Sequence, residues 1–95
     1  MAITFDPVKR ARTLRERGLD FKDAEIVFAG ETASQTSEQS DYGEVRVVTA
    51  GILGDRMVVI VWTRRGDNRH IISMRYCHAK EERKIRKQFA EVFKD

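Results

Sequence analysis

The sequence predicts an α+β domain in which helices pack on an antiparallel sheet. Two observations indicate this fold class. Two short helical segments punctuated by glycine come first, and three strand signals then follow one another with only tight turns between them. A further helical segment comes last. The expected order is β-α-α-β-β-β-β-α, with residues 1–95 forming one domain.

The N-terminal part has well-marked helix boundaries. After a short β-type run, Asp6 is a natural N-cap and Pro7 occupies the first helical position. Apolar residues then recur at helical spacing until Gly18, which is expected to end the first helix. A second helix is expected between Asp20, its cap, and Gly30, so that the two helices form a hairpin.

The C-terminal part is expected to contain the sheet. Residues 31–43 are polar and without clear periodicity, which predicts a loop or a weak edge strand. The unbroken apolar run from Met57 to Trp62 is typical of a central strand that is covered on both faces. The last helix is expected over residues 79–94. Strands joined by the turns GD and GDN are expected over residues 44–53, 56–65 and 69–77.

Composition narrows the class of protein. The formal net charge is +3, with 35% charged and 41% hydrophobic residues, as in a globular domain with a charged surface. No apolar run approaches the roughly 18–20 residues that span a bilayer. The N-terminus lacks the apolar stretch of a secretion signal. The single cysteine forms no internal disulfide, so we expect a cytoplasmic protein that uses no membrane.

The sequence lacks the strong catalytic signatures. One cysteine and two histidines do not make a zinc motif, and the P-loop and Gly-x-Ser-x-Gly patterns are missing. We therefore expect no metal and no cofactor. Any chemistry would be carried by side chains alone.

The basic C-terminal third contains the candidate site. Strict alternation along the last strand places Arg69, Ser73 and Arg75 on one face. Because strands pair side by side, Arg46 and Arg64 of the preceding strands could join Arg69 and Arg75 on one surface of the sheet. Guanidinium groups bind phosphate through a planar fork of donors, so this surface would suit a polyanion.

RNA cleavage requires little more than such a surface. The 2′-hydroxyl attacks the adjacent phosphate, so a ribonuclease must position the nucleotide, stabilise the phosphorane charge and move two protons. An aromatic side chain, Trp62 or Tyr76, could stack on a base. The residues that could move protons are His70, His78, Glu44 and Lys80.

Each of these residues also has a plainer interpretation, which the sequence favours when each is taken singly. Arg46 could pair with Glu44 or with an acid on a neighbouring strand. Trp62 would lie in the core. His70 would be partly buried and hydrogen-bonded, and Cys77 would be inert. The charges of the last helix interleave as on a solvated face, so only the joint placement of these residues favours a site.

Three ordered stretches carry further information: FDPVKRARTLRERGLDFKDAEIVF, GEVRVVTAGIL and RHIISMRYCHAKEER. Together they resemble the BrnT toxins of bacterial type II toxin–antitoxin modules, and the resemblance covers residues 5 to 83. The positions that match the family pattern are Phe5, Asp6, Pro7, Lys9, Gly18, Phe21, Ala24, Val27, Phe28, Glu44, Arg46, Arg69, Ile71, Ile72, Ser73, Arg75, Glu82 and Arg83.

The resemblance implies a RelE-like fold and a ribonuclease that cleaves RNA to arrest translation. It also implies a BrnA-like antitoxin with a DNA-binding domain, so that the toxin would contact DNA only through the complex. Under this hypothesis the catalytic residues are Arg64, Arg75, Arg46 and His78. The RNA-binding residues are Arg69, Lys80 and Trp62.

The chain departs from the family pattern at the end of the first helix. Where the family usually has Lys-His-Gly, this sequence has Glu16, Arg17 and Gly18. An alternative hypothesis is therefore a toxin fold that has weakened or lost activity and only binds a partner. A third is a nucleic-acid-binding domain without catalysis, whose RNA binding would weaken steeply with salt.

Overall fold

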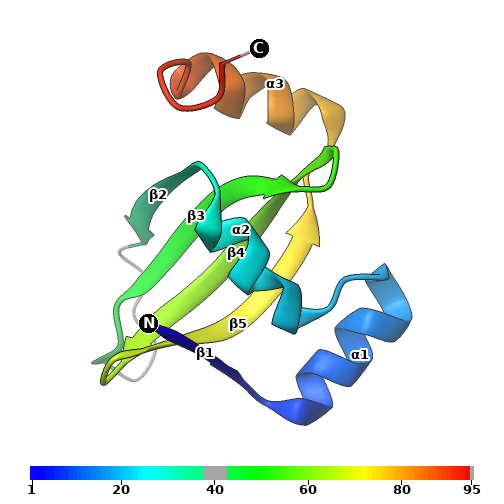
Figure 1. Cartoon of the computed structure of the whole chain (residues 1–95), viewed down its shortest axis with the longest axis vertical. Helices are drawn as coiled ribbons and strands as arrows, with labels where there is room; N and C mark the ends of the chain where they lie inside the picture. The colour runs from blue at the N-terminus through cyan, green and yellow to red at the C-terminus, as the bar shows by residue number, and fades with distance from the viewer. Residues whose placement is uncertain (38–42, 95) are drawn as a thin grey trace.

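The computed structural model describes residues 1–37 and 43–94 and has one five-stranded sheet with helices on both faces (Figure 1). The expected α+β fold class is confirmed. None of the described helices is long and apolar enough to cross a membrane. The elements are β1 (Ala2–Phe5), α1 (Pro7–Arg17), the 3-10 helix η1 (Phe21–Asp23), α2 (Ala24–Ala29), β2 (Thr32–Ser37), β3 (Arg46–Leu53), β4 (Arg56–Arg65), β5 (Asn68–Tyr76) and α3 (Ala79–Gln88).

The strand order in the sheet is β1-β5-β4-β3-β2. The strands β2 to β5 form the expected antiparallel meander, and β2 is an edge strand within the polar stretch 31–43. Residues 38–42 of that stretch lie outside the described residues. The expected antiparallel pairing does not extend to β1, which pairs in parallel with β5. This pairing is possible because α1, η1 and α2 carry the chain from one edge of the sheet to the other.

Two element boundaries differ from the expected ones. The second helix begins with the 3-10 helix η1 and becomes α-helical only at Ala24. The last helix ends at Gln88 rather than at residue 94. The backbone amides of Val92 and Phe93 both donate to the carbonyl of Phe89, so the chain turns there. The turn buries Phe93, which is only 6% exposed, against the sheet.

The sheet separates two apolar clusters. On one side, which we call the α2 face, Val58 and Ile60 of β4 pack with Ile71 and Met74 of β5 against η1 and α2. On the other side, which we call the α3 face, Met57 and Val59 of β4 pack in a cluster with Phe93, which follows α3 in the chain. Residues 57–60 of β4 are buried on both faces, as the apolar run predicts.

A β-bulge interrupts the alternation of β5. Val61 pairs with Ser73, whereas the next residue of β4, Trp62, pairs with Ile71. Ile72 therefore has no partner on β4. Residues before Ile72 consequently point to the opposite face from the one that strict alternation, counted back from Ser73, would give them. The prediction that Arg69, Ser73 and Arg75 share one face is wrong. Arg69 lies on the α2 face, with Ile71, whereas Ser73 and Arg75 lie on the α3 face.

Helix α1 is attached to the domain by polar contacts rather than by a buried apolar stripe. None of its residues is buried, and Val8 and Leu14 are 68% and 43% exposed. Nε and Nη2 of Arg10 donate to the two carboxylate oxygens of Asp20, with N–O distances of 2.8 and 2.9 Å. Arg17 Nη1 donates to the carbonyl oxygen of Met74 on β5, at 3.0 Å. These contacts fix α1 beside the sheet.

We expect Gly51→Ala to destabilise the fold. A Cβ on Gly51 would overlap Cγ1 of Val27 on α2 and stand 3.1 Å from Cγ2 of Thr32. Relieving this overlap in a packed core costs about 1–3 kcal/mol, measurable by urea unfolding. Gly30→Ala is the matched control, because its Cβ would meet only Val27 O at an ordinary 3.7 Å. Equal effects of the two substitutions would contradict the close approach of α2 to β3.

We expect Asp20→Asn to weaken the attachment of α1 while keeping the cap. Asparagine can still accept from the backbone amide of Lys22, but it loses the charge that binds Arg10. The expected loss of unfolding free energy is about 1 kcal/mol at pH 7.

The difference between wild type and this variant should depend on pH. Arg10 lowers the pKa of Asp20 from 3.8 to about 2. The native carboxylate therefore stabilises the fold fully above the unfolded value of 3.8, and the contribution disappears as the pH falls toward 2. A difference that stays constant from pH 7 to pH 2 would show that the ion pair is not its source.

Candidate functional site

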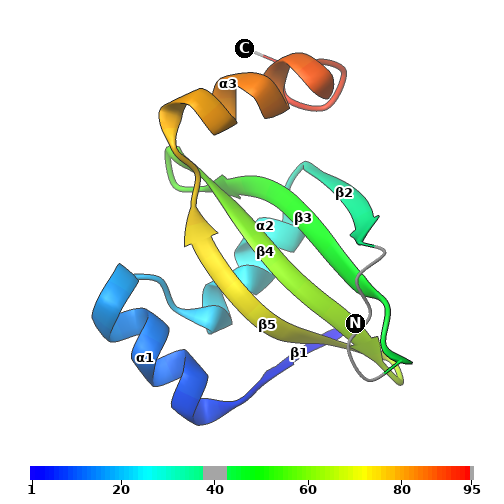
Figure 2. The ribbon, with the colours of Figure 1, turned by 180° about the vertical axis from the view of Figure 1, so that it is seen from behind.

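The α3 face of the sheet is covered at only one end. Figure 2 shows α3 across one end of the strands and no helix across the other. The register places a polar row over the uncovered end, because Arg46 pairs with Thr63, Thr63 with His70, and His70 with Thr4. Paired residues project to the same side of a sheet. This row is the first part of the candidate site.

A groove of about 370 Å³ lies between α1 and the uncovered end of the α3 face. Its floor consists of sheet residues on both sides of the bulge. Its wall is a stripe of α1. The sheet residues that line it are Arg46, Val61, Ile72 and Ser73. The α1 residues that line it are Lys9, Arg12, Thr13, Glu16 and Arg17.

The α1 wall follows from helical geometry. Positions 9, 12, 13, 16 and 17 lie at helical spacing and form one stripe. The exposed apolar residues Val8 and Leu14 fall on another side of the helix. The sequence contains this signal as basic residues recurring three to five positions apart, but the predicted site was confined to the C-terminal third. Lys9, Arg12 and Arg17 were therefore not among the predicted site residues.

The charge of the groove is mainly positive. Lys9 and Arg12 have no ion-pair partner within residues 1–37 and 43–94, although Glu16 lies in the same groove. Several arginines outside the groove are neutralised by acids, as Arg65 is by Glu44 through two hydrogen bonds of 2.9 and 3.1 Å. The groove thus gathers the cations Lys9, Arg12, Arg17 and Arg46 around a single acid, Glu16.

His70 is the titratable group of the polar row. It is half-buried, and its Nδ1 lies 2.9 Å from Oγ1 of Thr4, so the expectation of a partly buried, hydrogen-bonded histidine is confirmed. Burial lowers the pKa of His70 below its ordinary 6.5, and the positive charges of Arg65 and Lys9 act in the same direction. The imidazole is therefore neutral at pH 7. The influence of Lys9 also links the row with the groove.

The four arginines that were expected to converge are divided between the two faces. Arg46 and Arg75 lie on the α3 face, whereas Arg64 and Arg69 pair with each other on the α2 face. The expected convergence is wrong because Arg46 stands opposite Thr63 rather than Arg64, and because the bulge separates Arg69 from Arg75. Register, which local sequence does not fix, decides both points.

Arg75 is joined to α3 by a two-pronged ion pair. Its Nη1 and Nη2 donate to the carboxylate of Glu81 at 2.7 and 2.8 Å, which lowers the pKa of Glu81 to about 2. Burial raises the pKa of the neighbouring Cys77 to about 11, so its thiol stays protonated. Arg75 therefore connects β5 to α3 at the margin of the uncovered surface.

On the α2 face, Arg69 and Trp62 take part in packing. The guanidinium carbon of Arg69 lies 4.0 Å from the ring centroid of Phe28 and 5.2 Å from that of Trp62. Trp62 donates its indole N–H to Oγ1 of Thr49 at 2.8 Å. The plainer interpretation of Trp62 as a packing residue is confirmed, since it packs half-buried against the core cluster.

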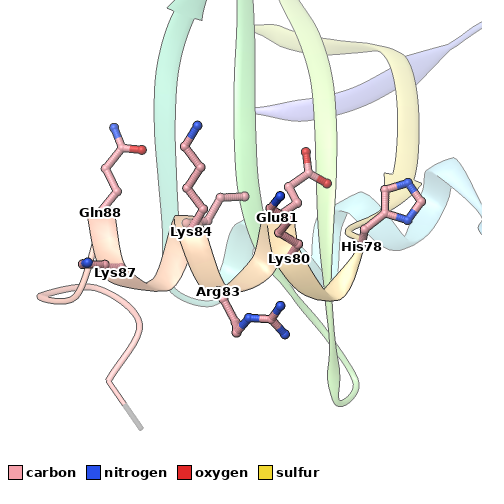
Figure 3. A pocket seen from close by; sticks show the side chains of 8 residues that line it. His78, Lys80, Glu81, Arg83, Lys84, Lys87 and Gln88 are labelled. Carbon is pink, nitrogen blue, oxygen red and sulfur yellow. The ribbon is translucent and has the colours of Figure 1, made fainter.

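His78 and Lys80 lie at the start of α3, beside a second and wider groove of about 1010 Å³. Figure 3 shows the side chains of this groove, with Lys84 on the side of the strands and Arg83 on the opposite side of α3. His78 precedes the first helical residue but makes no side-chain cap hydrogen bond. These two predicted site residues are therefore not part of the groove beside α1.

The described residues contain no group of three or more His, Cys, Asp or Glu side chains that could hold a metal ion. A family model described as "Ribonuclease toxin, BrnT, of type II toxin-antitoxin system" matches residues 5–81 of the chain. A search of curated proteins found no match.

Proposed function

Since the chain belongs to the BrnT family of ribonuclease toxins of type II toxin–antitoxin systems, we propose that residues 1–95 form one toxin domain that cleaves RNA without a metal ion. One observation carries the choice of site: the groove that holds Arg46 also gathers Lys9, Arg12 and Arg17 of α1, next to the row with His70. A concave, positive surface of this kind suits a polyanionic substrate.

The proposed chemistry uses two residues of the polar row. Neutral His70 accepts the proton of the 2′-hydroxyl, and the 2′-oxygen attacks the adjacent phosphorus. Arg46 stabilises the charge that develops on the phosphorane. The bond from phosphorus to the 5′-oxygen breaks, and water supplies the proton to this leaving oxygen. The products are a 2′,3′-cyclic phosphate and a 5′-hydroxyl.

The spacing within the row supports this division of roles. Arg46 and His70 are both paired with Thr63 from opposite sides. Strands lie about 4.8 Å apart, so their Cα atoms are about 10 Å apart. Both side chains are long enough to meet at one phosphate between them. Because the imidazole of His70 is neutral at pH 7, it can act as a base.

The other predicted site residues take different parts in this proposal. Arg75 remains a candidate second phosphate ligand, since it lies on the same face, but it must share its guanidinium with Glu81. Lys80 keeps its predicted role as an RNA contact, to a more distant part of the RNA. His78, which was predicted to be catalytic, is given such a contact role instead. Arg64, Arg69 and Trp62 are left out because they lie on the α2 face.

The family also supports a proposal about partners. Membership of a toxin–antitoxin system implies a cognate antitoxin, and we infer a BrnA-like protein that carries the DNA-binding domain of the complex. The toxin itself would contact RNA, and DNA only through the antitoxin. Its action would be in the cytoplasm, where cleavage of RNA arrests translation.

A second candidate is a toxin fold without activity. It is favoured by Arg17, which stands where the family usually has a histidine and whose guanidinium donates to the Met74 carbonyl. A guanidinium does not act as a general base at neutral pH. In the proposed mechanism this role belongs to His70, so the two candidates are separated by whether the purified protein cuts RNA.

We expect Arg46→Ala to lower the rate of RNA cleavage by about 100-fold, because the phosphorane charge loses its stabilising group. Arg64→Ala is the matched control, an exposed arginine on the other face, and should leave the rate nearly unchanged. The readout is cleavage of a fluorescent RNA by purified protein, with and without EDTA. Equal losses in both variants would refute the site, and inhibition by EDTA would refute the metal-free mechanism.

We expect His70 to set the pH dependence of cleavage. The kcat/KM of the wild type should rise with pH and level off above an apparent pKa below 6.5, because the free base is the active form. His70→Ala should lower kcat/KM by about 100-fold and flatten this limb. An unchanged pH profile in the variant would exclude His70 as the base.

The same residue should affect stability in a defined direction. Native His70 binds its proton less readily than a histidine in the unfolded chain, so unfolding free energy falls as the pH drops below 6.5. Comparing urea unfolding of wild type and His70→Ala at pH 7 and pH 5.5 separates this effect from catalysis.

A further inference from the structure

Core packing does not explain the composition of α1. The helix has no buried residue, and its apolar Val8 and Leu14 are exposed and do not line the groove. The stripe that it turns toward the sheet is polar and basic instead. Even so, the helix is fixed at two points, by the ion pair of Arg10 with Asp20 and by the hydrogen bond from Arg17 to β5. A helix held so that cations face a groove is arranged for a ligand.

The cations in this groove stand together in one concave space, with Lys9 and Arg12 on its α1 wall and Arg46 on its floor. Some arginines outside it are held by acids, such as Arg75 by Glu81. Lys9 and Arg12, within the described residues, have no such partner. Leaving neighbouring like charges unpaired is unfavourable unless an anion joins them.

We infer that the α1 wall binds the sugar–phosphate backbone of single-stranded RNA next to the phosphate that is cleaved. This inference rests on the proposed function, which puts the scissile phosphate at Arg46, on the floor of the same groove. From Lys9 to Arg17 the wall is about 12 Å long, at 1.5 Å per residue. At about 3.4 Å per stacked nucleotide, it covers roughly three nucleotides. The toxin would therefore favour substrates that extend beyond the cleaved dinucleotide.

The residues that line the groove also determine which parts of an RNA strand it can bind. Its side chains offer ammonium, guanidinium and hydroxyl donors, the last from Thr13 and Ser73, which are the groups that contact phosphate and sugar. None of the residues that line it is aromatic. Base stacking has no platform there, and the nearest indole, Trp62, lies on the α2 face. Binding along α1 should therefore tolerate any sequence.

The test measures binding separately from cleavage. The probe is a fluorescent 12-nucleotide RNA with 2′-O-methyl groups, which cannot be cleaved, titrated with the full chain at several salt concentrations. Lys9→Ala/Arg12→Ala should weaken binding on the order of tenfold. It should also reduce the slope of log affinity against log salt by about 1.4, the value for two lost phosphate contacts on a single strand.

The matched control is Arg15→Ala/Lys22→Ala, which removes the same charge from exposed positions outside the groove lining. It should change affinity much less than the groove variant. Lys9→Arg/Arg12→Lys, which keeps both charges, should bind as the wild type does. Circular dichroism should show that all variants keep the fold. The inference is overturned if the groove and control variants weaken binding equally, or if neither does.

The two proposals fail in different ways. If the wild type cleaves RNA while the groove variant binds and cleaves long RNA normally, the α1 inference is overturned and the proposed function stands. If the wild type cleaves no RNA but binds the methylated probe through Lys9 and Arg12, the proposed function fails and α1 is still an RNA-binding wall. Affinity that depends strongly on base sequence would overturn the backbone mode of binding.

Discussion

The β-bulge at Ile72 is the constraint on which the arrangement of the site depends. Ile71 and Met74 are three residues apart, so a strictly alternating strand would place them on opposite faces. Both are fully buried in the same cluster against η1 and α2. The bulge makes this possible, because the one unpaired residue brings both side chains to the α2 face. The same shift turns Ser73 toward the α3 face.

The uncovered end of the α3 face arises from where the helices attach. The last helix and the turn after it cover only the end of the sheet with the second apolar cluster, and Phe93 closes that cluster. Helix α1 lies beside β5 through polar contacts. Between them the sheet presents Arg46 and His70 to solvent-accessible space, so its register determines the proposed chemistry.

The candidate site was only partly predictable from the sequence. Arg46 was identified, because a guanidinium on a strand beside other cations suggests phosphate binding, and His70 was recognised as a half-buried histidine. Arg64 and Arg69 were expected beside Arg46 but lie on the α2 face. Alternation predicts which side chains of one strand share a face. Predicting which side chains of two strands lie together also requires the register, which depends on contacts between residues far apart in the sequence. The basic stripe of α1 was visible at helical spacing, but its partner surface was not.

The sequence by itself determined the elements whose signals are local. Asp6 caps α1 through a 2.9 Å hydrogen bond, Gly18 ends it with a φ of 69°, and the apolar run of β4 is the buried central strand. These features depend on backbone preferences and on burial of neighbouring residues. The tertiary structure alone decided the parallel pairing of β1, the early end of α3 and the face of each arginine. Each of these depends on long-range packing, in which distant apolar residues must fill one core before any polar side chain has a fixed direction.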